Sequence, residues 1–150
     1  MKKYIKFIPA FMALLMIMGC GKKEEIVIDD LSSAISANVV FSEQLTQIDT
    51  KNIERRYSLN AKDYNEIKSF VGTVSVCDEY VIVKTDAPQT MADKFNEYIK
   101  DKRDIYEAYR PNEVHKLDSA VIETYNNAVV MIVTADSENA LNVYKEYLKK

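Results

Sequence analysis

Few side chains in this 150-residue sequence could do covalent or metal chemistry. It contains two cysteines, Cys20 and Cys77, and a single histidine, His115. A thiol–imidazole nucleophile would need a third group to orient the imidazole and an oxyanion site, and nothing in the sequence marks either. One histidine and one free thiol cannot supply the three or four ligands of a zinc site. We therefore predict no catalytic residue, no metal and no cofactor, with Cys77 buried as a small hydrophobe and His115 on the surface.

Two pairs of adjacent carboxylates, Asp29-Asp30 and Asp78-Glu79, are the other candidates for acid–base chemistry. Catalytic carboxylates of glycoside hydrolases face each other across a cleft, whereas neighbouring residues on a helix or turn point apart. We expect the first pair to cap a helix and the second pair to lie in a hairpin turn. The scarcity of glycine also argues against a phosphate-binding loop.

Residues 1–19 have the pattern of a secretory signal. A lysine-rich start is followed by an apolar run over residues 7–18 that only Pro9 interrupts. This run is too short to span a bilayer as a helix, which takes about 20 residues. A charged start, a short apolar stretch and a small residue at the cut are typical of a cleavable signal rather than of an anchor helix.

The signal ends in Ile17-Met18-Gly19-Cys20, which resembles the lipobox of bacterial lipoproteins. Ile17 matches the aliphatic position and Gly19 the small position that flank the cut, while Met18 departs from the usual small residue. The resemblance implies that Cys20 receives a diacylglyceryl group and becomes the first residue after cleavage. Two acyl chains attach a protein stably to a bilayer, whereas one chain is only marginal. We expect a lipid anchor at the extracytoplasmic face of the cell membrane, with residues 20–28 as a flexible tether. An ordinary signal peptide with a chance cysteine and an uncleaved anchor are the alternatives.

The composition is that of one ordinary domain. Hydrophobic residues make up 47% of the chain, and its net charge of −3 would become −6 once the three signal lysines are removed. Acidic and basic residues alternate without a cationic stripe, which argues against nucleic acid as a partner. Because lipidation would use Cys20, no intramolecular disulfide is possible, and residues 29–150 are expected to fold on their core alone, as a monomer.

The hydrophobic pattern of residues 29–150 predicts a single α+β domain. A first helix, with Leu31, Ile35 and Val39 on its apolar side, and a short polar helix near residues 51–56 come before two strand–strand–helix units. We expect the units to form a four-stranded, mainly antiparallel sheet with two long helices on one face. The expected ranges are 67–76, 80–84 and 86–109 for the first unit, and 120–125, 129–134 and 136–148 for the second.

Further details of these units follow from the residue pattern. Residues 95–100 match residues 144–149, which suggests a duplication, although any two core-facing helices share a period. Strand residues 129–133 are all apolar, so both sheet faces should be covered. We therefore expect the first helix to cover at least part of the face that the two long helices leave open. Asn126-Asn127 should supply the left-handed conformations of a tight hairpin turn.

Four short motifs stand out along the predicted elements: Tyr57-Ser58-Leu59, Cys77-Asp78-Glu79, Tyr109-Arg110-Pro111 and Asn127-Ala128-Val129-Val130. With these motifs, the order of elements resembles a small Gram-positive lipoprotein family catalogued as domain of unknown function 4358. The resemblance covers roughly residues 41–147, and an Asn-Asn turn here replaces a glycine-containing one. It implies lipid-anchored export and no established activity.

One corner is a candidate partner-binding surface. A helix should end at Tyr109-Arg110-Pro111, and tyrosine and arginine are enriched in binding hot spots; a purely structural corner is the alternative. We expect a non-enzymatic binding or scaffold module that engages an envelope protein or peptide. A small envelope hydrolase or thiol enzyme, or a solute-binding accessory lipoprotein, is the alternative function.

Overall fold

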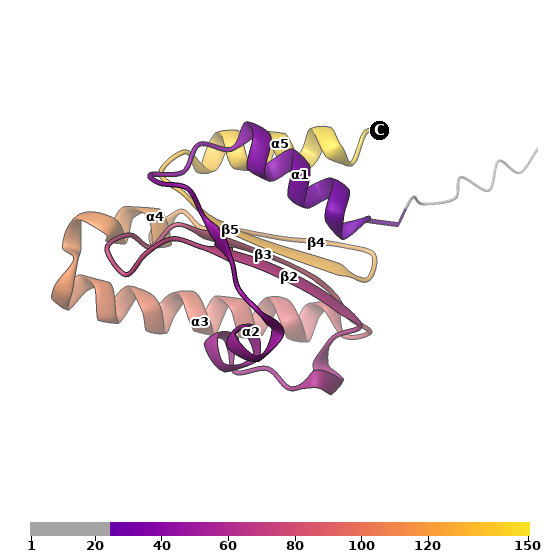
Figure 1. Ribbon diagram of the computed structural model, residues 1–150, viewed down its shortest axis with the longest axis horizontal. Helices are drawn as coiled ribbons and strands as arrows, with labels where there is room; N and C mark the ends of the chain where they lie inside the picture. Colours follow the sequence, from indigo (N-terminus) through magenta and orange to yellow (C-terminus); the bar gives the residue numbers. More distant parts are fainter. Residues whose placement is uncertain (1–24) are drawn as a thin grey trace, which may run out of the picture.

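The computed structural model describes residues 25–150. The predicted signal and the lipobox residues Ile17, Gly19 and Cys20 lie outside this range. In the described part the chain forms three layers, with a sheet between two layers of helices (Figure 1). None of the described helices is both long and apolar enough to cross a membrane.

The sheet has five antiparallel strands in the order β1-β2-β3-β5-β4. Four of them are the strands that the sequence predicts. The fifth, β1, adds an edge strand to the expected four, and two residues are too few to show a hydrophobic period. The strands are β1 Thr46–Gln47, β2 Glu66–Val71, β3 Glu79–Lys84, β4 Val121–Tyr125 and β5 Ala128–Val133.

The helices lie on both faces of this sheet. Helices α1 and α5 cover one face, and α2 and α3 cover the other (Figure 1). The prediction that both long helices share a face is therefore wrong, because α3 and α5 lie on opposite sides. The helices are α1 Ile28–Asn38, α2 Thr50–Tyr57, α3 Pro88–Tyr109, α4 Val114–Asp118 and α5 Ser137–Tyr147, with short 3-10 turns at Ala61–Asp63 and Pro111–Glu113.

Alternate residues of the central strands fill two separate cores. In β3, Tyr80 and Ile82 point toward α1 and α5, whereas Val81 and Val83 point toward α2 and α3. All six residues of β5 are buried, which confirms that an entirely apolar strand is covered on both faces. The first helix does pack on the sheet, since α1 buries Leu31 and Ile35 in the core that contains Tyr80, but it shares this face with α5 rather than covering a face that both long helices leave open.

Local signals set the ends of the long helices. Pro88 occupies the first turn of α3, where a missing N–H costs no hydrogen bond, and Pro111 follows its last residue. The side chain of Asp136 caps α5 by accepting from the Asn139 backbone N–H at 3.1 Å. In the hairpin between β4 and β5, Asn126 takes the expected left-handed conformation, with a φ of 53°, whereas the prediction is wrong for Asn127, whose φ is not positive.

The packed structure begins before Asp29, the expected boundary. Ile26 and Ile28 are buried in the α1 core, and α1 starts at Ile28 after an N-cap, Val27, that makes no side-chain capping bond. Asp29 and Asp30 therefore lie in the first turn of α1 rather than capping it. There Asp29 accepts a hydrogen bond from Lys68 Nζ at 2.7 Å, and negative side chains favour the positive end of the helix dipole.

The two strand–strand–helix units are of opposite hand. Each helix follows the inner strand of its pair, but α3 and α5 pack on opposite faces of one sheet whose inner strands, β3 and β5, are antiparallel neighbours. A rotation that superimposed β3 on β5 and β2 on β4 would place both helices on the same face. The geometry therefore favours the alternative to a duplication: the shared period of α3 and α5 reflects two core-facing helices.

Candidate functional site

A buried carboxylate lies at the first residue of β3, on the face that α2 and α3 cover. The Glu79 side chain is fully buried, and it accepts hydrogen bonds from Lys102 Nζ at 2.6 Å and from Arg56 Nε at 2.7 Å. The hydroxyls of Tyr98 and Tyr57 donate to the same carboxylate at 2.8 Å and 3.1 Å. The prediction that Asp78-Glu79 forms a hairpin turn is therefore wrong: the turn lies earlier, at residues 74–75.

The charges around this carboxylate fix its protonation state. Burial disfavours the ionised form of Glu79, but the positive charges of Lys102 and Arg56 outweigh burial and hold its pKa below the ordinary value of 4.5. Burial and the Glu79 charge raise the pKa of Tyr98, so its phenol stays protonated and donates. At neutral pH two cations therefore surround one anion, which leaves one positive charge in excess.

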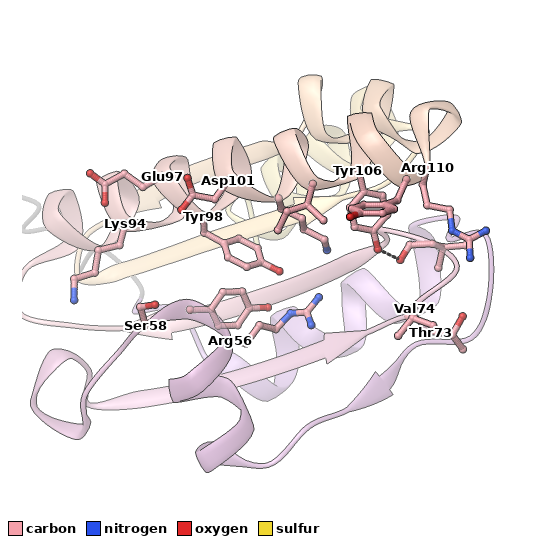
Figure 2. Close-up of a pocket in the computed structure, with 16 residues that line it drawn as sticks. Arg56, Ser58, Thr73, Val74, Lys94, Glu97, Tyr98, Asp101, Tyr106 and Arg110 are labelled. Atoms are coloured by element: carbon pink, nitrogen blue, oxygen red, sulfur yellow. Dashed lines mark hydrogen bonds between the residues drawn. The ribbon is translucent and has the colours of Figure 1, made fainter.

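A groove of about 770 Å³ opens above this cluster (Figure 2). It lies between one side of α3, the C-terminal end of α2 and the loop that joins β2 to β3. Its rims carry three large apolar side chains that the domain core does not bury: Val74 is 89% exposed, Ile105 58% and Tyr109 80%. Exposed apolar side chains gathered around a concave surface are typical of an interaction site.

The guanidinium of Arg56 is directed into this groove (Figure 2). Its one hydrogen bond to the described residues runs from Nε to Glu79, so both Nη groups lack a protein partner within residues 25–150. The guanidinium is held by the rings of Tyr57 and Tyr98, whose centroids lie 6.0 Å and 5.9 Å from its central carbon. Glu79 and these rings thus orient a rigid pair of unused donors toward the groove.

The predicted Tyr109-Arg110-Pro111 corner lies at one end of the same groove. Tyr109 and Arg110 line the groove, while Pro111 starts the following 3-10 turn and is not part of the lining. The Arg110 side chain is exposed and makes no ion pair or hydrogen bond with any residue of the described range. The corner that the sequence suggests for partner binding therefore adjoins the Arg56 site, which sequence reasoning missed.

A second buried ion cluster lies beside the first and serves to hold loops together. Lys116 Nζ lies 2.6 Å from Asp78 Oδ2, 2.8 Å from Glu113 Oε2 and 2.7 Å from Ser42 Oγ. Cys77, Asp78 and Glu113 each place one potential metal ligand within 4.8 Å of the others. The Lys116 ammonium bridges the two carboxylates, and a positive group in that position disfavours a cation there.

The two residues considered for thiol chemistry are not arranged as a nucleophile pair. Cys77 is buried, as predicted, and burial raises the pKa of its thiol to about 12. Its Sγ donates to the Glu113 carbonyl oxygen at 3.4 Å. His115 is exposed, as predicted, and its Nδ1 lies 2.8 Å from the carbonyl oxygen of Asn112.

A further hollow of about 900 Å³ lies between the start of α1 and the end of α5. Its lining includes Glu25, Tyr147 and Lys150, which lie near the two ends of the described chain. It contains no buried ion cluster comparable with the one at Glu79. We therefore treat the groove beside α3 as the candidate functional site.

Comparison with protein families gives one match. The family model described as "Domain of unknown function (DUF4358)" matches residues 37–134, a range that includes Arg56, Glu79 and Lys102. Comparison with curated proteins and with solved structures finds no match.

Proposed function

The chain belongs to the DUF4358 family, and we propose that it is a monomeric, non-enzymatic binding module held at the extracytoplasmic face of the cell membrane. Cys20 is the proposed lipid attachment site, and the groove beside α3 is the proposed site for an envelope protein or peptide. The observation that carries this proposal is the Arg56 guanidinium, oriented by buried Glu79 and presented to a groove with exposed apolar rims.

The position of the described N-terminus supports a groove that faces away from the membrane. The Glu25 carboxylate oxygen Oε1 lies 3.8 Å from Nζ of Lys84, which is the last residue of β3. Glu79 and the β2–β3 loop lie at the other end of that strand, about 17 Å away for five residue steps at roughly 3.3 Å each. A tether that enters near Lys84 would place the membrane at one end of the sheet and the Arg110 end of the groove at the other.

The chemistry of the buried groups favours binding over catalysis. The Cys77 thiol is buried and protonated at neutral pH, so it would be a poor nucleophile. Glu79 is ionised and already accepts from four side chains, which leaves it unsuited to proton transfer. These features weigh against the hydrolase and thiol-enzyme alternatives.

Photo-crosslinking in living cells tests this proposal. A photoreactive amino acid replaces Val74 or Ile105 on the groove rims, and Lys145, an exposed residue of α5 on the opposite layer, serves as the control position. We expect a discrete crosslinked product from the groove positions alone. The product should disappear when Arg56→Gln is added and persist with Arg55→Gln, since Arg55 is an exposed neighbour that does not line the groove. Equal products from Lys145, or none from the rims, would contradict the proposal.

A further inference from the structure

The donors, charges and apolar surfaces of the groove define the chemistry of its occupant, if the groove binds a partner as proposed above. We infer that the occupant is an acidic peptide segment in which a carboxylate lies next to an aliphatic or aromatic side chain. The carboxylate contacts Arg56, and the neighbouring side chain packs against the exposed rims.

The Arg56 guanidinium offers the geometry that a carboxylate requires. Its two Nη groups have no partner in the described part of the protein, and they present parallel N–H donors to the groove. Carboxylates accept such a fork through both oxygens. Because Glu79 holds Nε at 2.7 Å and the rings of Tyr57 and Tyr98 flank the group, little side-chain entropy is lost on binding.

The charge of the groove varies along its length. Near the β2–β3 loop, Arg56 and Lys102 outnumber Glu79, and Arg110 adds a cation that is unpaired among the described residues. Toward the other end the lining carries Glu97 and Asp101, and Lys94 there is paired with Asp63 at 2.9 Å. In Figure 2 the labelled acids lie toward the Lys94 end and Arg110 lies at the opposite end. A bound segment would therefore place its carboxylate between Arg56 and Arg110.

The apolar surface favours a peptide over a purely anionic polymer. The Tyr98 hydroxyl donates to Glu79 and the Tyr106 hydroxyl donates to the Val76 carbonyl oxygen at 2.9 Å, so these two side chains present ring surface to an occupant. Val74, Ile105 and Tyr109 add aliphatic and aromatic surface at the rims. A polyphosphate chain would gain nothing from these groups, whereas an aliphatic or aromatic side chain gains about 25 cal/mol for each Å² that it buries.

Peptide selection followed by matched variants tests the inference. The full-length protein in detergent micelles is used to select binders from a display library of random heptapeptides, and the enriched peptides are synthesised for fluorescence polarisation. We expect them to contain aspartate or glutamate next to an aliphatic or aromatic residue. Replacing that acid by its amide should weaken binding at least tenfold. Arg56→Gln should weaken it to a similar extent, and Arg55→Gln should leave it unchanged.

A second pair of variants separates the ligand chemistry from the fold and from the proposed function. Arg56→Gln removes a partner of buried Glu79 and so lowers stability, whereas Arg110→Gln breaks no bond within the described residues and should weaken binding about threefold. Val74→Gln tests whether a peptide lies in the groove at all. Peptides that lose affinity with Val74→Gln but contain no acid would overturn the acidic occupant and leave the proposed function standing. Binding that is indifferent to Val74→Gln, or no enriched peptide, would overturn both.

Discussion

Glu79 contributes to stability only while its partners remain, because it carries its charge where solvent does not reach. Moving an ion into the protein interior costs several kcal/mol, and the attraction to Lys102 and Arg56 together with two tyrosine hydrogen bonds offsets that cost. Such a cluster is therefore weak evidence of net stabilisation. It does hold α2, β3 and α3 in one arrangement, and the orientation of Arg56 depends on that arrangement.

Removal of one cation from this cluster should destabilise the protein strongly. Lys102→Met leaves the buried Glu79 carboxylate with one cation, and we expect a loss of about 3–5 kcal/mol in the free energy of unfolding, measured by urea denaturation. Lys100→Met is the matched control, since Lys100 is an exposed residue of the same helix, and it should change stability by less than about 0.5 kcal/mol. Similar losses for the two variants would show that the charge cluster is not responsible.

The same carboxylate should make stability depend on acid pH. Because the pKa of Glu79 is lower in the folded protein than its ordinary value of 4.5, the unfolded chain binds the proton more readily. The contribution of Glu79 is therefore fully present above about pH 5 and is lost as the pH falls through the folded-state pKa. We expect the unfolding free energy of Glu79→Gln to fall less steeply between pH 5 and pH 3 than that of the unchanged protein. Identical slopes would contradict the assignment.

At the scale of elements, hydrophobic period predicts the type of each long segment but not the face on which it packs. The apolar period of residues 91–106 predicts one core-facing stripe, and Met91, Phe95 and Tyr98 do lie on the inner side of α3, whereas Ile105 on the same stripe is 58% exposed. Three of the expected strands lie within one residue of their predicted ranges, and β2 ends at Val71 rather than near residue 76. Both faces of β5 are apolar, so either α3 or α5 could bury its apolar side chains against either face of this strand. The choice of face depends on connections between elements, and these are not encoded in a local period.

The candidate site was harder to predict because its signals are single polar residues at apolar positions. Lys102 occurs three residues after Ile99 and four before Tyr106, so it lies on the apolar stripe of α3. A charged residue is unusual at such a position. Asp78 and Glu79 precede an apolar strand, and that position is equally typical of a turn. Arg56, in α2, and Lys102, in α3, lie 46 positions apart in the sequence. Only the folded domain brings both of them to Glu79, in β3.

The two sides of α3 should differ sharply in their effect on stability. Phe95 is 0% exposed and packs edge-to-face against Tyr57 at 5.6 Å between ring centroids. We expect Phe95→Ala to cost about 3–5 kcal/mol in unfolding free energy, because it removes a large side chain and leaves a cavity. Ile105→Ala on the groove rim should cost less than about 1 kcal/mol. Thermal and urea unfolding measure both, and a large loss for Ile105→Ala would mean that the rim is part of the core.

At the scale of the whole molecule, the first described residue, Glu25, and the β2–β3 loop beside the groove lie at opposite ends of β3. Four residues lie between Cys20 and Glu25, and a fully extended chain over those five residue steps spans at most about 18 Å. The sheet adds about 17 Å along β3, from Lys84 to Glu79. A lipid-anchored protein would thus present the Arg110 end of its groove to partners a few tens of ångströms from the membrane surface, which suits a partner in the envelope.

The proposed lipid anchor can be tested with an internal control, because the chain contains only two cysteines. Cells that express the protein are fed an alkyne-tagged palmitate, and the label is read on the purified chain. We expect Cys20→Ala to abolish the label and to release the protein from the membrane fraction or leave it with its signal uncut, since the lipobox cysteine accepts the diacylglyceryl group before cleavage. Cys77→Ala should keep the label, because Cys77 is buried and its thiol is protonated at neutral pH. A Cys20→Ala protein that is still processed, labelled and membrane-bound would remove the basis for placing this domain at the membrane, although the groove would remain a binding site to be tested elsewhere.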